Sequence, residues 1–155
     1  MSRFLRSHER MDASEVLQLQ DEIVAAVANA IEDAWDAAVV NLEIGATDGE
    51  VAIDCLALYF TWNRGEWKRK SLDFPYECCG LFTKLRDSGA GPKWSVCMLE
   101  IDSSGKYKFD YAYDAPRRLN GVFDDEALLK GYRPQAVPHK SRLRAFLDRF
   151  RTCYA

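Results

Sequence analysis

The feature that most constrains the fold is a change in hydrophobic period near residue 36. Over residues 13–35, apolar side chains recur every three or four positions, which is typical of one face of an α-helix. Asp12 and Glu15 have the spacing of a capping box at the start of this helix. From Ala38 to Ile44 the apolar residues recur every second position, which indicates a β-strand. The change therefore predicts a helix from about 13 to 35, followed by a sheet.

Short turn signals then divide the middle of the chain. Asp48-Gly49 is a hairpin signal, and Asn63-Arg64-Gly65 and Ser103-Ser104-Gly105 indicate two further tight turns. Strands joined by short turns are antiparallel neighbours. The further strands expected between these turns are 51–62, 67–72, 94–102 and 106–114. Lys68, Arg69 and Lys70 suit 67–72 as an exposed edge strand.

Helical patterns return in three later segments. A helix is expected over 75–86, a short one near 124–129, and an arginine-rich one over 141–154. The expected fold class is therefore α+β, with an N-terminal helix, a mainly antiparallel sheet of about five strands, and helices packed on one face. The 155 residues form one expected domain, with a loose N-terminus over 1–11.

The last two strands show the clearest alternation in the chain. Tyr107, Phe109, Tyr111 and Tyr113 share one predicted face, and the opposite face includes Asp110 and other charged residues. An aromatic face of this kind is either core or a platform on which nucleic-acid bases stack. Stacking platforms need a basic surround, so the interleaved acids favour core packing.

Known chemical motifs are missing from the sequence. The two histidines, His8 and His139, lack neighbours at metal-ligand spacing, and nucleophile-elbow, phosphate-loop and dinucleotide motifs do not occur. We therefore expect no catalytic residue, no metal and no cofactor. Five cysteines without paired spacing indicate reduced thiols in a cytoplasmic protein. No signal peptide is recognisable, and the uncharged apolar run Cys55–Trp62 is too short for a membrane helix.

Acidic residues are concentrated in the first half of the chain. Residues 11–66 hold twelve acids and one arginine, a net charge of −11, whereas residues 127–155 hold seven bases and one acid, a net charge of +6. The acidic half would repel phosphates and attract a basic protein. The plainer interpretation is that these acids only solvate outer faces of the fold.

One hairpin carries a family resemblance. Its first strand runs Trp-Ser-Val-Cys-Met-Leu-Glu-Ile-Asp over 94–102, and Ser-Ser-Gly leads into Lys-Tyr-Lys-Phe-Asp-Tyr-Ala-Tyr-Asp over 106–114. With the preceding Leu-Phe-x-x-Leu of 81–85, this pattern resembles the YezG/EsaG-like immunity (antitoxin) family of bacterial polymorphic toxin systems. The specific part covers about 30 residues, and the chain departs from the family in its arginine-rich C-terminal segment.

The resemblance implies a small cytoplasmic inhibitor that binds a cognate toxin C-terminal domain, typically a basic nuclease. On that reading the acidic side of the hairpin and the loop after it form the first candidate surface, and the helix acids form the second. Trp62 and Trp67 are candidate anchors, with core burial an equal alternative. The candidate acids are Asp110, Asp114, Asp124, Asp125 and Glu126 on the first surface, and Asp21, Glu22, Glu32 and Asp33 on the second.

Other classes of function stay open. A protein-binding adaptor or chaperone module would share every feature named above except the toxin. A small enzyme would need an acidic site such as Asp110 with Asp114, because paired carboxylates can perform acid–base work. Nucleic-acid binding would rest on the C-terminal arginines. We expect neither nucleic acid nor a membrane as partner, and the sequence leaves the oligomeric state open.

Overall fold

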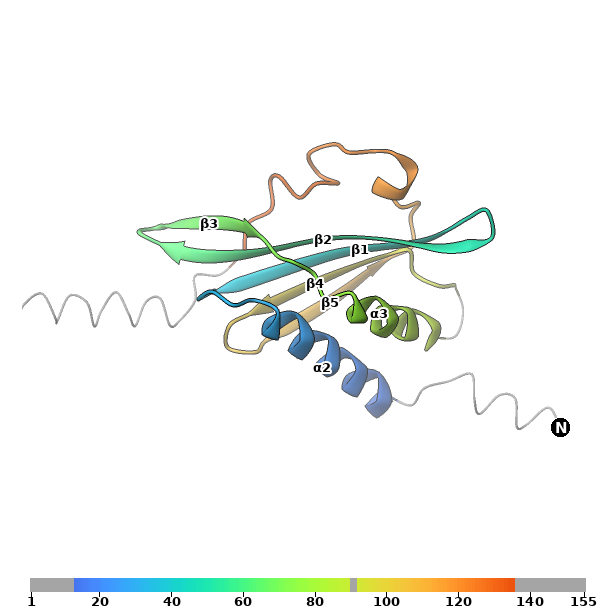
Figure 1. The fold of residues 1–155 in the computed structure, drawn as a ribbon, viewed down its shortest axis with the longest axis horizontal. Coiled ribbons are helices and arrows are strands. Elements are labelled where there is room, and N and C mark those ends of the chain that lie inside the picture. Colours follow the sequence, from blue (N-terminus) through green and yellow to red (C-terminus); the bar gives the residue numbers. More distant parts are fainter. Residues whose placement is uncertain (1–12, 90–91, 136–155) are drawn as a thin grey trace, which may run out of the picture.

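A computed structural model describes residues 13–89 and 92–135, in which two helices and a short 3₁₀ segment accompany one sheet (Figure 1). The helices are α2 (Ala13–Asn29) and α3 (Glu77–Asp87), and the 3₁₀ segment is η1 (Arg118–Asn120). The strands are β1 (Ala37–Thr47), β2 (Glu50–Asn63), β3 (Glu66–Ser71), β4 (Val96–Asp102) and β5 (Tyr107–Ala112).

The sheet is antiparallel throughout, in the order β3-β2-β1-β4-β5. β1 lies at its centre, pairs with β2 through the Asp48-Gly49 hairpin and pairs with β4 on its other side. β3 and β5 are the two edges. The expected α+β class with five antiparallel strands is confirmed, and the lysine-rich third strand lies at an edge as its charges suggest.

Both helices cover the same face of the sheet (Figure 1). Ile23 and Val27 of α2 and Phe82 of α3 are fully buried against this face. Their apolar side chains leave water together with the inward residues of the strands, which is the main driving force for such a layer. The buried strand residues of this core are Ala38, Val40, Leu42, Ile44, Ala57, Tyr59, Cys97, Leu99 and Ile101.

The opposite face of the sheet is covered in part by the segment that follows β5. Leu129 from this segment packs with Val39, Leu58 and Phe60 in a second, smaller core, and the ring of Tyr132 lies against that of Phe60. The central strand β1 is therefore buried on both faces. The sequence did not predict this second layer, because the turn-rich segment shows no periodic apolar pattern.

α2 ends at Asn29, earlier than the expected residue 35. Ile31 and Trp35 still contact the helix-side core, but they do so from an irregular connection. At the start of the sheet, the Asp36 amide donates to the carbonyl of Phe60 and its carboxylate accepts the amide of Trp62 at 2.7 Å. These contacts require extended backbone before β1 begins.

The short helix expected near 124–129 is a run of turns. The Lys130 amide donates to the carbonyl of Asp125, and Leu129 has a positive φ of 54°, a left-handed conformation that ends any helix. The expected capping box at Asp12, the loose N-terminus over 1–11 and the helix over 141–154 lie outside the described residues.

Candidate partner-binding surface

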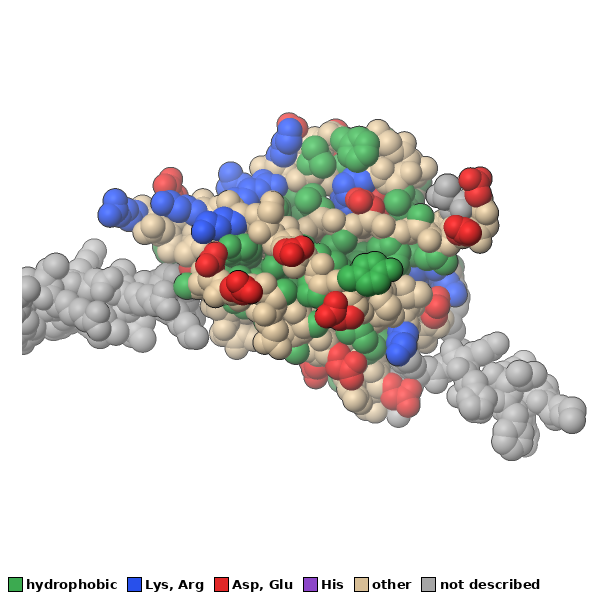
Figure 2. All heavy atoms as spheres, in the orientation of Figure 1, with side chains coloured by type: hydrophobic (Ala, Val, Ile, Leu, Met, Phe, Trp, Pro, Cys, Tyr) green, Lys and Arg blue, Asp and Glu red, His purple; other side chains and the backbone are tan. Residues whose placement is uncertain are grey.

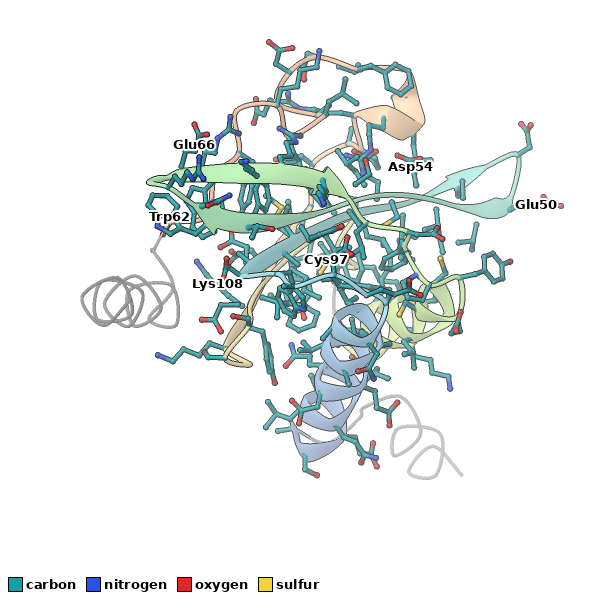
Figure 3. The ribbon with its side chains drawn as sticks, turned by 60° about the vertical axis from the view of Figure 1, so that its left-hand side comes forward. Glu50, Asp54, Trp62, Glu66, Cys97 and Lys108 are labelled. Carbon is teal, nitrogen blue, oxygen red and sulfur yellow. The ribbon has the colours of Figure 1, made fainter. Side chains whose placement is uncertain are left out.

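A buried arginine attaches the segment after β5 to the sheet. The Arg118 side chain is 4% exposed and donates to the side-chain oxygen of Asn41 and to the carbonyl of Ala127, at 2.9 and 2.8 Å. It also forms an ion pair with the Asp54 carboxylate, which projects from β2 toward the side of the sheet that carries η1 (Figure 3). One side chain thus joins β1, β2 and the far end of its own loop.

Glu43 completes this network from the centre of β1. Its carboxylate is 3% exposed, lies 3.4 Å from the Arg118 guanidinium, and accepts the backbone amides of Arg118 and Leu119 at 3.2 and 3.0 Å. A buried carboxylate is tolerated when it is paired and hydrogen-bonded in this way. We conclude that the Arg118 network, defined as Arg118, Glu43, Asp54 and Asn41, fixes where the segment leaves the sheet.

Surface contacts shape the outer part of the segment. Arg117 lies between Asp124 and Glu126, at 3.1 and 3.0 Å, and the Asp124 carboxylate accepts the amide of Ala127 at 2.8 Å. Asp125 lies 3.5 Å from Lys130. Asp124 therefore has a structural role in the turn, whereas Asp125 and Glu126, 84% and 81% exposed, point into solvent.

Two apolar residues stand exposed beside these acids. Val122 is 43% exposed and Phe123 is 62% exposed, directly after the left-handed Gly121 and directly before Asp124. An exposed phenylalanine on a loop that is fixed at both ends loses little conformational freedom when a partner covers it. We define residues 122–126 as the candidate knob: an apolar tip with an acidic border.

We expect Gly121→Ala to lower the free energy of unfolding by about 1 kcal/mol, because φ at Gly121 is +80° and a Cβ there meets no atom within 4 Å. The cost would be backbone strain alone. Gly80→Ala in α3 is the matched control; it has equal space, and helix propensity should raise stability by about 1 kcal/mol. Urea denaturation measures both. Equal effects of the two substitutions would contradict the left-handed turn.

Neither acid predicted on the hairpin, Asp110 or Asp114, belongs to the candidate knob. Asp110 lies on the edge strand β5, 3.3 Å from Lys108. The knob belongs to a segment that contacts β1, β2 and β3, with Arg69 of β3 donating to the carbonyls of Leu128 and Lys130. Asp114 follows β5, and its carbonyl accepts the Ser95 hydroxyl.

The helix-side acids lie on the other face of the sheet, so the two predicted surfaces are separate. Asp21 accepts the Tyr107 hydroxyl at 2.7 Å, and Asp33 accepts the Tyr59 hydroxyl at 2.8 Å. Both bonds raise the pKa of the tyrosine involved. Glu22 and Glu32 are exposed, and Glu22 accepts from Gln18.

Trp62 and Trp67 face each other across the β2–β3 hairpin. Their ring centroids are 5.0 Å apart, and Trp67 packs edge-on against Phe60. Both side chains are half-buried (Trp62 is labelled in Figure 3). Trp67 contributes to the smaller core, and only part of each ring stays accessible as an anchor.

The surface charges separate by region. Figure 2 shows lysine and arginine side chains gathered over the β2–β3 hairpin and acidic side chains over the two helices. The basic cluster includes Arg64, Lys68 and Lys70, all exposed, with Lys70 3.8 Å from Asp33. The acidic faces are therefore local features of a molecule whose net charge is only −3.

The described cysteines are free, and their surroundings keep them protonated. Burial raises the pKa of Cys78 to about 11 and also raises the pKa values of Cys55 and Cys97. A nucleophilic cysteine needs the opposite shift. Residues 13–89 and 92–135 hold no group of three potential metal ligands, and none of their helices is long and apolar enough to span a membrane.

We predict that Cys55, Cys78 and Cys97 resist alkylation by iodoacetamide at pH 8 in the folded chain. The thiolate is the reacting species, and a raised pKa keeps it scarce at all three residues. Burial also blocks access to Cys78 and Cys97, and Cys55 is half-buried. Unfolding in urea should make all three react rapidly, because the pKa returns to its ordinary value. Mass spectrometry of tryptic peptides measures the modification, and rapid native labelling at Cys55 or Cys97 would contradict the packing.

Sequence reasoning missed the residues that build the candidate surface. Arg118 lies in a segment without periodicity, so nothing local indicates that it is buried. A weak signal existed in β1, where Asn41 and Glu43 interrupt an otherwise apolar strand. Polar residues on a central strand imply a polar partner above them, but they do not say which residue supplies it.

The sequence matched no model of a known protein family, and a search of curated proteins also found no match.

Proposed function

We propose that this chain is an immunity protein, an antitoxin that binds a basic toxin domain, such as a nuclease, and neutralises it inside the producing cell. The candidate knob is the observation that carries the proposal: Phe123 and Val122 are exposed, bordered by Asp125 and Glu126, and held by the Arg118 network. The resemblance of the 94–114 hairpin to the YezG/EsaG-like family supports it from the sequence side.

The candidate knob has the composition of a binding hot spot in a protein–protein interface. Hot spots consist of a few aromatic anchor residues within a polar border that excludes water. The acids add speed, because complementary charge accelerates encounter with a basic partner. A nuclease is basic where it holds phosphate, so an acidic border competes for the same surface. Inhibition of a lethal enzyme requires tight binding, and a nanomolar complex corresponds to about −12 kcal/mol.

Growth rescue tests the proposal. The C-terminal domain encoded by the neighbouring open reading frame is induced in a host cell, with and without this chain. We expect growth arrest without the chain and growth with it. Arrest in both cases would contradict immunity against that domain, and growth in both cases would favour an adaptor that binds a harmless partner.

A charge-reversal variant tests the surface. Asp125→Lys with Glu126→Lys should reduce rescue, and the association rate should fall and lose its salt dependence. Asp124 is left unchanged because it holds the turn. The matched control is Glu50→Lys at the exposed β1–β2 turn (labelled in Figure 3), which should rescue like the wild type. Full rescue by the double variant would show that Asp125 and Glu126 do not belong to the interface.

A further inference from the structure

The outer edge of β5 has no partner among the described strands. The sheet order places β5 last, after β4. The opposite edge, β3, carries the consecutive charges Lys68, Arg69 and Lys70, which discourage pairing with another strand. β5 carries Lys108 and Asp110, which cancel each other and give no such protection. The two edges of the sheet therefore differ in their readiness to accept a strand.

The hydrogen-bond pattern shows which backbone groups of β5 face outward. The Lys106 carbonyl accepts the Asp102 amide at 2.9 Å, so residue 106 faces β4. In an antiparallel ladder alternate residues face the same neighbour. The amides and carbonyls of Tyr107, Phe109 and Tyr111 therefore face the open edge.

This edge is complementary to itself. If two copies of β5 pair antiparallel about Phe109, then Tyr107 of each copy lies opposite Tyr111 of the other. Lys108 of each copy then lies opposite Asp110 of the other, at non-hydrogen-bonded positions, where opposed side chains come closest. Both charged side chains are available for this contact, at 70% and 52% exposure, on the same face of the sheet.

Apolar surface continues beside the edge. Tyr111 is 36% exposed, and its hydroxyl accepts from Gln20 of α2 at 3.1 Å. Leu17, 55% exposed, lies one turn before Asp21, the residue that accepts the Tyr107 hydroxyl. Leu17 therefore lies one helical turn from the contact between α2 and β5.

We propose that the chain forms a homodimer by antiparallel pairing of β5 with β5 of a second copy. The sheet would continue through both copies, with about six new main-chain hydrogen bonds and about two reciprocal Lys108–Asp110 ion pairs. The proposal is independent of the proposed function, because it uses neither the knob nor any toxin.

Charge reversal combined with mixing tests the dimer. Sedimentation and light scattering should give the wild type twice its chain mass of 17.7 kDa. Lys108→Asp places an aspartate opposite Asp110 in both pairs, and Asp110→Lys places lysines opposite each other, so each variant alone should be monomeric. Lys108 is labelled in Figure 3 on β5. Circular dichroism checks that each variant stays folded.

Mixing the two single variants shows whether the substitutions act on the contact between two copies or on the Lys108–Asp110 ion pair within one copy. The Lys108→Asp chain presents two acids and the Asp110→Lys chain presents two lysines, so a mixture should form a heterodimer with twice the chain mass. Mixing cannot restore a contact inside one chain. A wild type that is monomeric at every concentration, or a dimer that survives both single reversals, would overturn the proposal.

Discussion

Replacing Arg118 by Met should lower the free energy of unfolding by about 3–5 kcal/mol, the usual cost of removing one partner of a buried ion pair. The arginine side chain is 4% exposed, and its loss leaves the Glu43 carboxylate, 3% exposed, without a cation. It also removes donors to Asn41 and to the carbonyl of Ala127. The Asp54 carboxylate is 44% exposed, so water can solvate it once the arginine is gone. It therefore contributes less than Glu43 to the loss of stability.

The neighbouring residue supplies the control. Arg117 forms ion pairs with Asp124 and Glu126 at the surface and is 45% exposed, so Arg117→Met should cost only about 0–1 kcal/mol. Adding Glu43→Gln to Arg118→Met should recover part of the loss, because it removes the uncompensated charge. Urea denaturation of the wild type and these variants measures the differences. Equal losses for Arg117→Met and Arg118→Met would refute the anchoring role of the network.

Replacing Phe123 by Ser should weaken binding of the cognate toxin domain by about 2–4 kcal/mol, or roughly 30- to 700-fold in Kd. Phe123 is 62% exposed in the free chain, so its removal should leave the free energy of unfolding nearly unchanged. The loss would fall mainly on the dissociation rate, as is usual for interface anchors.

Val51→Ser is the matched control for this variant, because Val51 is 63% exposed but lies on the β1–β2 hairpin. It should bind like the wild type. Calorimetric titration of the purified toxin domain gives the affinities, and denaturation gives the stabilities. Wild-type affinity in the Phe123→Ser chain would place the interface elsewhere, with the acids of α2 as the next surface to reverse.

The elements that could be predicted are those that pack against only one layer of the fold, because one buried face gives a regular apolar pattern in the sequence. The alternation over 107–113 placed four aromatic residues on the packed side. The structure packs Tyr107 and Phe109 against the helix-side core, whereas Tyr111 and Tyr113 are 36% and 63% exposed. The tight turns and the charged edge strand were predicted because glycine conformation and edge protection are local properties. The predicted end of α2 was wrong: the helix stops at Asn29, and the chain then joins β2 through contacts of Asp36 that are distant in sequence.

The candidate surface was predicted only in part. Asp125 and Glu126 were identified, but Val122 and Phe123 were not, because an apolar residue in an aperiodic segment gives no sign of whether it is buried or exposed. Leu129 and Phe123 illustrate this. They belong to one loop, yet the first is 7% exposed and the second 62% exposed.

The sequence alone determined the α+β class, the positions of the turns and the inward faces of the strands, since period and turn chemistry act within a few residues. The tertiary structure decided that the segment after β5 folds back over β1 and β2, and that Arg118 is buried between Glu43 and Asp54. That outcome depends on pairing charges and filling space between residues more than sixty positions apart. Only the complete fold sets such distances.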